Sequence, residues 1–150
     1  NPWTDDVWTH EHGPRGGDEL NLIRPKHNYG WPKVTFGIDY DGSTISTRTT
    51  GPGFTAPLHH WTPSIAPSGM TFVYGPEFPL WQGDLLIGSL KFRQLRHLKM
   101  KGTKVLSEEI LLKEFDERIR DVEIGPAGIV YILTDHKNGK LIRISRARKR

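Results

Sequence analysis

Residues 83–89 read Gly-Asp-Leu-Leu-Ile-Gly-Ser, and residues 128–134 read Gly-Ile-Val-Tyr-Ile-Leu-Thr. In both copies a glycine precedes a short apolar run. Segment 66–72 precedes the first copy and 120–124 the second, and segments 95–98 and 141–144 follow them. The central runs, at Leu85 and Ile129, start 44 residues apart, within the roughly 40–50 residue period of β-propeller blades. The repeat predicts consecutive blades, about three of them in this chain.

Short strands separated by Gly, Pro or Asn account for most of the chain, and several alternate apolar and polar residues as a half-buried strand does. The stretch 107–115 is too short for an isolated helix and is interpreted as an outer strand. The predicted class is therefore all-β. The strands are expected at 7–9, 19–23, 71–74, 84–89, 94–99, 108–112, 119–124, 129–134 and 140–144.

Composition supports a turn-rich folded domain. The 150 residues include 16 Gly and 11 Pro, about 18% against an average of roughly 12%. A Gly-, Thr- and Pro-rich stretch from Val34 to His60 is predicted to be a long loop that carries function or an interface. Four tryptophans, Trp3, Trp8, Trp31 and Trp81, are expected to pack within blades.

The sequence excludes several kinds of site and structure. With no cysteine, the chain has no disulfide scaffold, thiolate zinc site or cysteine nucleophile. No apolar run approaches the roughly 18 residues of a membrane span. The chain begins with Asn1 rather than Met, so we expect it to be processed or to be a piece of a longer protein, and its compartment cannot be read directly.

Basic residues gather at the end of the chain. The formal net charge is +4, and much of the excess lies in 143–150. We interpret 146–150 as a solvated basic tail and expect no nucleic acid partner, since a short terminal run is a weak signal of binding. Nucleic acid binding stays a third hypothesis, resting on this tail alone.

The stretch 10–19, His-Glu-His-Gly-Pro-Arg-Gly-Gly-Asp-Glu, carries the densest chemistry. Its glycines allow carbonyl oxygens to turn toward one centre, and Asp18 and Glu19 add carboxylate oxygens, which suits calcium. A glycine-rich turn with a solvated acidic pair explains the same residues, with Asp18 as a turn cap. His10 and His12 would supply only two zinc ligands, so zinc is not expected.

Six motifs occur here in the order in which they occur in a known family. The chain resembles, from Asn1 to Ile144, the soluble glucose/sorbosone dehydrogenases, which are quinoprotein aldose sugar dehydrogenases that use pyrroloquinoline quinone (PQQ). The resemblance implies a six-bladed β-propeller of which residues 1–145 form roughly the last half, about three blades. The motifs are 12–19, 28–32, 61–70, 88–91, 118–122 and 133–135.

The resemblance also implies a calcium- and cofactor-binding set. Gly13 and Pro14 match a pair whose carbonyls hold the calcium that contacts PQQ. Glu19, by its side chain, and Tyr29, by its carbonyl, match a second calcium site that supports structure or a homodimer contact.

The cofactor itself is expected to meet other positions. Lys91, Arg118 and Arg120 match cations that bind the carboxylates and quinone oxygens of PQQ, as fixed cations suit an anionic ligand. Ser64 matches a hydroxyl lining the same pocket. His59 and Trp61 lie where relatives place aromatic residues over the cofactor.

The implied reaction is oxidation of the anomeric hydroxyl of an aldose, with a histidine as base and hydride transfer to PQQ. That histidine is expected upstream of Asn1, so the catalytic residues of this chain are unknown. None of its seven histidines stands in the matching context. The 150 residues alone are therefore predicted to be inactive, and the missing N-terminal half of the propeller is an expected partner.

Two further expectations come from the resemblance. The location is predicted to be the periplasm or the cell exterior, although the chain shows no signal peptide. The alternative to an enzyme is a non-enzymatic propeller module that binds carbohydrate or protein and keeps calcium for structure. Retention of Lys91, Arg118 and Arg120 together favours the enzyme.

Overall fold

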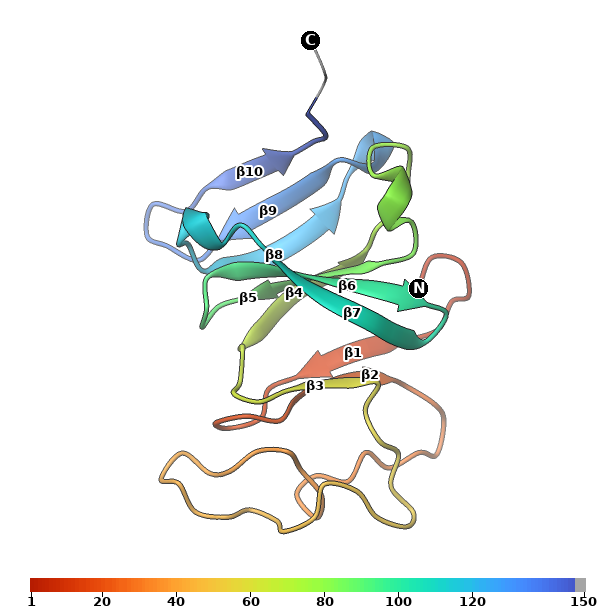
Figure 1. The fold of residues 1–150 in the computed structure, drawn as a ribbon, viewed down its shortest axis with the longest axis vertical. Helices are drawn as coiled ribbons and strands as arrows, with labels where there is room; N and C mark the ends of the chain where they lie inside the picture. The colour runs from red at the N-terminus through yellow and green to blue at the C-terminus, as the bar shows by residue number, and fades with distance from the viewer. Residues whose placement is uncertain (148–150) are drawn as a thin grey trace. The chain divides into compact units, whose positions relative to one another are not determined.

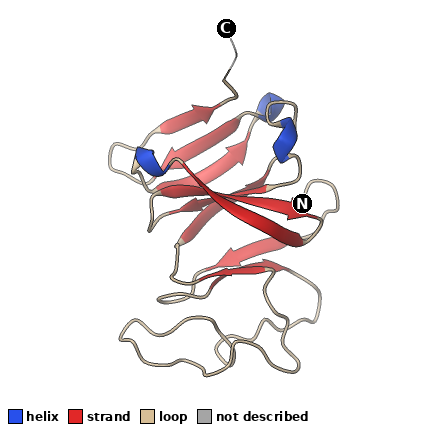
Figure 2. Ribbon diagram, viewed as in Figure 1, coloured by secondary structure: helices blue, strands red, loops and turns tan. Residues whose placement is uncertain are grey.

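The computed structural model describes residues 1–147 and is built from β-strands (Figures 1 and 2). The all-β prediction is confirmed, because helices in this part of the chain are limited to three 3₁₀ turns. Residues 148–150 of the predicted basic tail lie outside the described residues. The strands are β1 (Trp8–Glu11), β2 (Asp18–Leu22), β3 (His59–Trp61), β4 (Pro67–Phe72), β5 (Leu85–Ser89), β6 (Gln94–Lys101), β7 (Lys104–Leu111), β8 (Ile119–Ile124), β9 (Val130–Thr134) and β10 (Leu141–Ile144).

The chain divides into two compact units, the first comprising Asn1–Pro67. Its sheet has the strand order β1-β2-β3, all antiparallel. Trp8, Leu20 and Trp61 are buried within this unit. Strand β3 was not predicted, because His59–Trp61 is only three residues long and offers no alternation; its pairing with Asp18–Leu20 creates it.

A long loop joins β2 to β3, drawn mainly in orange in Figure 1. Residues 23–58 contain no strand, as predicted for the stretch from Val34. The loop is held by main-chain bonds such as Thr35 N to Arg48 O (3.0 Å) and Thr55 N to Asn28 O (2.8 Å). These bonds give an otherwise irregular segment a defined path.

The second unit begins at Ser68 and contains two sheets. One has the order β4-β5-β6-β7 and the other β8-β9-β10, so the two sequence copies form equivalent runs of consecutive antiparallel strands. A shared apolar cluster that includes Val73, Leu86 and Ile132 lies at the core of this unit. Gly88 of β5 allows close packing, since an added Cβ would lie 2.8 Å from the Ile119 side chain.

The predicted outer strand at 107–115 is correct only in part. Strand β7 ends at Leu111, and Lys113–Phe115 form a 3₁₀ turn. The reason is the backbone of Leu112, whose φ of 58° is left-handed and cannot continue a strand. The extended stretch instead starts earlier, at Lys104.

The tryptophan expectation is confirmed at two positions and wrong at two. Trp8 is buried and Trp81 packs against the core of the second unit. Trp3 and Trp31 are 54% and 57% exposed, because they lie in the turn before β1 and in the long loop, outside any sheet. Within residues 1–147 the structure has no helix able to span a bilayer.

Candidate functional site

A buried carboxylate organises the glycine-rich turn of the first unit. Asp18, the first residue of β2, is fully buried. Its Oδ1 accepts from Gly13 N (2.8 Å). Its Oδ2 accepts from Ser64 Oγ (2.8 Å), Ile65 N (2.7 Å) and Ala66 N (2.9 Å). The interpretation of Asp18 as a turn cap is confirmed, and the cap joins two segments that lie far apart in sequence.

Glycine is required in this turn for steric reasons. A Cβ on Gly13 would collide with the carbonyl oxygen of Gly16. Gly17 has a φ of +72°, and its Cβ would lie 2.6 Å from Gly37 N, so both the conformation and the close approach exclude larger residues. The turn is therefore folded tightly on itself and against the long loop.

Three of the four predicted calcium residues line one cavity. Gly13, Glu19 and Tyr29 border a space of about 130 Å³, together with Glu11 and Trp31 among others. Pro14 is not among its lining residues. The structure thus brings together Gly13 and Glu19, which the resemblance places in two separate calcium sites.

Two carboxylates face this cavity from paired positions. Glu11 and Glu19 stand opposite each other on β1 and β2. The Asn21 amide nitrogen donates to both, at 3.0 Å to Glu11 Oε1 and 3.3 Å to Glu19 Oε2. Burial, with the neighbouring Glu11 charge, raises the pKa of Glu19 to about 7, although the Asn21 hydrogen bond opposes the shift. One amide does not balance two carboxylates, which is the electrostatic setting that favours a cation.

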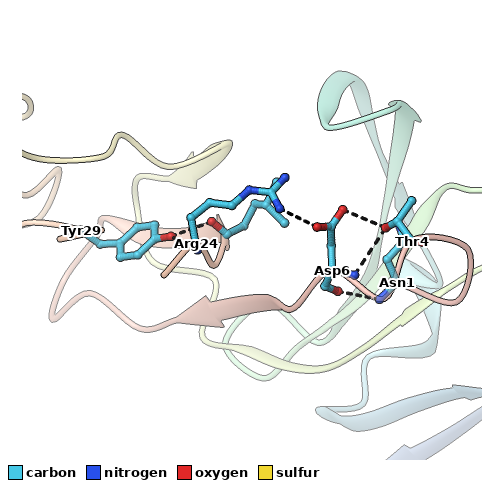
Figure 3. Close-up of polar contacts among 6 residues, drawn as sticks. Asn1, Thr4, Asp6, Arg24 and Tyr29 are labelled. Atoms are coloured by element: carbon cyan, nitrogen blue, oxygen red, sulfur yellow. Dashed lines mark hydrogen bonds and ion pairs between the residues drawn. The ribbon is translucent and has the colours of Figure 1, made fainter. Parts of the chain in front are cut away.

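Tyr29 is fixed at the cavity by its hydroxyl group. The hydroxyl donates to Leu22 O (2.7 Å) and accepts from Arg24 N (2.9 Å), which ties it to the end of β2 (Figure 3). The Arg24 guanidinium pairs with Asp6 Oδ1 (2.6 Å), so the segment before β1 is attached to the same corner. Tyr29 thereby has a fixed place in the lining of the cavity that Glu19 also borders.

In the second unit, two predicted cofactor residues meet on one carboxylate. Asp135 Oδ2 accepts from Arg118 Nε (2.8 Å) and pairs with Arg120 Nη2 (2.9 Å). These hydrogen bonds hold the pKa of Asp135 below its ordinary value. Arg118 and Asp135 also line an open cavity of about 500 Å³. Two further ion pairs border it, Arg93 with Asp116 and Lys140 with Glu117.

A β-bulge sets the position of Arg120. In the β8–β9 ladder Ile119 stands opposite Thr134, but Asp121 stands opposite Leu133, so Arg120 is the extra residue. Ile119 and Val122 are both buried although they are three positions apart, which a regular strand with a period of two does not allow. The bulge keeps both in the core and leaves Arg120 exposed.

Neither of the other two predicted cofactor residues is among those that line the cavity of Arg118 and Asp135. Lys91 follows β5 and is exposed, with its Nζ 5.4 Å from the centre of the Phe92 ring. Ser64 belongs to the first unit and is buried, and its hydroxyl donates to Asp18 and accepts from Ala66 N (3.2 Å).

The histidines are occupied in structural contacts. His12 Nε2 lies 2.6 Å from Pro67 O, and the His59 ring meets Trp61 edge-on at 4.7 Å. In the second unit His97 lies beside Asp84. Among residues 1–147 no three His, Asp or Glu side chains gather as a metal-binding group.

Sequence reasoning missed three residues of these sites. Glu11 is opposite Glu19, which a hairpin alignment of 8–11 with 19–22 would have shown. Asn21 bridges the two carboxylates, and its polar side chain two positions after Glu19 was the available signal. Asp135 was quoted only as part of a motif, without a role.

Antiparallel sheets in consecutive runs, a glycine-rich turn closed by Asp18 and an arginine pair on Asp135 characterise this chain as an all-β protein with a polar, charged site. The chain belongs to the glucose/sorbosone dehydrogenase family, whose model matches residues 1–143. The family resemblance drawn from the motifs is therefore confirmed.

Relatives of this family are similar over nearly the whole chain. Aldose sugar dehydrogenase YliI of Escherichia coli K12 is 42% identical over 97% of the chain, and the uncharacterized protein slr1608 of Synechocystis is 45% identical over 95%. A crystal structure titled glucose dehydrogenase is 47% identical with a TM-score of 0.94 over 98% of the chain. The PQQ-bound aldose sugar dehydrogenase of Streptomyces coelicolor is 28% identical, with a TM-score of 0.64 over 95% of the chain.

The chain spans only part of these relatives. It covers 35% of slr1608, 40% of YliI, 43% of the glucose dehydrogenase structure and 40% of the Streptomyces enzyme. These shares fit the expectation that the chain is part of a larger propeller.

Proposed function

We propose that this chain is the C-terminal part of a PQQ- and calcium-dependent aldose sugar dehydrogenase with a six-bladed propeller. The observation that carries the proposal is the pairing of Arg118 and Arg120 on Asp135, with Arg118 and Asp135 lining a polar cavity. Family membership and the PQQ-bound relative support it. The parent protein is taken to be the longer polypeptide or complex that supplies the remaining segments.

The arginine pair fits an anionic cofactor. Both guanidinium groups are about half exposed, at 46% and 52% of the side chain, so donors remain for a ligand after Asp135 is bound. PQQ carries three carboxylates, which guanidinium groups bind through paired hydrogen bonds. Lys91 would add a third, more mobile cation from the end of β5.

The acidic cavity of the first unit fits calcium. Its carboxylates at Glu11 and Glu19 are hard oxygen donors. Burial first, and then the neighbouring Glu11 charge, raise the pKa of Glu19, and a bound cation would offset both effects. Glu19 and the main chain of Tyr29 would hold this ion, and the carbonyls of Gly13 and Pro14 would hold the ion beside the cofactor. A homodimer contact at the Glu19 site belongs to the same proposal.

PQQ, when bound, supplies the redox chemistry by accepting a hydride. The residues of this chain bind and orient it: Arg118, Arg120 and Lys91 hold its anionic groups, and Asp18 fixes the turn that presents Gly13 and Pro14. The base that takes the anomeric hydroxyl proton is a histidine outside this chain. The 150 residues alone are therefore proposed to be inactive.

The test is a titration of the apo parent protein with PQQ, with calcium and with a chelator, followed by addition of an aldose. Calcium-dependent binding with reduction of the quinone on addition of sugar supports the dehydrogenase. Absence of binding in both conditions supports the alternative, a non-enzymatic module that binds carbohydrate or protein. Replacing Arg120 by Ala should abolish reconstitution, whereas Lys26→Ala, an exposed cation of the long loop, is the matched control.

We further propose that the parent protein works in the periplasm or outside the cell. Recovery of the tagged parent protein with the periplasmic or secreted fraction would support this location, and recovery with the cytoplasmic fraction would contradict it.

A further inference from the structure

Asp135 is bound to Arg118 through its main chain as well as through its side chain. It directly follows β9, and its main-chain N–H donates to Arg118 O (2.8 Å). The backbone of Asp135 is thus attached to the backbone of the residue whose side chain its carboxylate binds. This main-chain hydrogen bond fixes the backbone of Asp135 relative to the start of β8, whether or not a ligand is bound.

One oxygen of this carboxylate serves both arginines. Arg118 Nε and Arg120 Nη2 lie 2.8 and 2.9 Å from Asp135 Oδ2. Two guanidinium groups this close repel each other unless an anion lies between them. The side chain of Asp135 is 32% exposed, against 46% for Arg118 and 52% for Arg120, so both guanidinium groups keep more contact with solvent than the carboxylate does.

The bulge in β8 also contributes to the placement of the two arginines. Because Arg120 is the inserted residue, it leaves the core side of the strand while Ile119 and Val122 stay buried. The backbone therefore presents Arg118 and Arg120 on the exposed side, and the carboxylate of Asp135 fixes their guanidinium groups.

We propose that Asp135 is a positioning residue that holds the guanidinium groups of Arg118 and Arg120 side by side as one anion-binding unit. The identity of the anion as PQQ rests on the proposed function above, but the positioning does not. Asp135 does not touch the cofactor; it acts through the two arginines. Four N–H donors of each guanidinium group remain available after the contact with Asp135.

Binding of PQQ to the apo parent protein tests the inference with Asp135→Asn and Asp135→Ala. An equilibrium titration followed by cofactor absorbance should show a dissociation constant raised about tenfold, the low end of the effect of removing an orienting partner. Asp116→Asn is the matched control, because Asp116 lines the same cavity but pairs with Arg93; its dissociation constant should stay within about twofold.

The direction of the change in affinity distinguishes a positioning role of Asp135 from a purely electrostatic effect of its charge. Removing a carboxylate makes the site more positive, so electrostatics alone predicts tighter binding of an anion. Unchanged or tighter binding by both Asp135 variants would overturn the inference. Asp135→Glu, which keeps the charge on a longer side chain, should restore part of the affinity.

Crystal structures of the apo parent protein and its Asp135→Ala variant separate this inference from the proposed function. We expect Arg118 and Arg120 to move apart in the variant while the main-chain bond from residue 135 to Arg118 persists. Unmoved guanidinium groups would overturn the positioning role. If the wild-type protein does not bind PQQ at all, the proposed function fails, and these structures alone decide the role of Asp135.

Discussion

His97 Nε2 lies 2.8 Å from Asp84 Oδ2, and both side chains are buried in the second unit. The other oxygen of Asp84 accepts from Met100 N (2.8 Å), and the His97 ring lies against Trp81 with ring centres 4.4 Å apart. One carboxylate thus joins the residue before β5 to two positions of β6. Buried polar groups that satisfy one another in this way specify how strands pack.

Asp84→Ala should therefore destabilise the parent protein. The change leaves the Met100 N–H and the His97 ring without their acceptor, at a cost of about 2–4 kcal/mol in the free energy of unfolding. Equilibrium urea unfolding measures the effect. Glu123→Ala, at an exposed position of β8, should change the same free energy by less than about 0.5 kcal/mol; equal losses in the two variants would contradict the role of Asp84.

Asp18→Ala should disrupt the glycine-rich turn. Four donors lose their acceptor, three of them main-chain or side-chain groups of residues 64–66. We expect a loss of about 3 kcal/mol or more in stability and a weaker thermal shift on adding calcium. Asp41→Ala, at an exposed turn where Oδ1 accepts from Ser43 N, is the comparison, and a calcium response that survives in Asp18→Ala would count against the proposed function of the turn.

Gly13→Ala tests the steric argument directly. The added methyl group collides with Gly16 O, so the turn cannot keep its path. Differential scanning fluorimetry should show a lowered melting temperature and loss of the calcium-induced shift. Gly51→Ala is the control, because its Cβ would meet only ordinary contacts at 3.4 Å; similar behaviour of both variants would show that the turn tolerates a side chain.

The stabilisation provided by Asp135 should depend on pH. Arg118 and Arg120 lower its pKa from an ordinary value of 3.8, so the folded state binds this proton less readily than the unfolded chain does. The carboxylate therefore stabilises the fold above about pH 4 and progressively less as the pH falls through its lowered pKa. The difference in melting temperature between wild type and Asp135→Asn should stay steady above about pH 5 and shrink as the pH falls below about pH 4, and an equal difference in both ranges would contradict this linkage.

Much of the fold was accessible from sequence because the strands are short, alternate in polarity and are separated by Gly and Pro. The central strands β5 and β9 were placed within one residue, since the glycine and apolar run repeat. Strand β3 could not be predicted, because His59–Trp61 is a strand only through its pairing with β2. Position Leu112 was misjudged because nothing in its residue type signals a left-handed backbone.

The site was only partly predictable, for a similar reason. Motifs identified Arg118 and Arg120, but their shared partner depends on the end of β9 lying beside the start of β8. Glu11 was missed because cross-strand pairing, not sequence spacing, places it opposite Glu19. The bulge could have been inferred from the apolar positions 119, 122 and 124. The first two are three residues apart, whereas the last two show the spacing of two that is typical of a regular strand.

The bulge at Arg120 also separates the constraints on the exposed position of β8 from those on its buried positions. Ile119 and Val122 are buried in the apolar interior, whereas Arg120 is exposed and pairs with Asp135. A substitution at Arg120 can therefore change the exposed side of β8 without repacking the interior. A single extra residue thus lets the exposed position of β8 change independently of the positions that form the core.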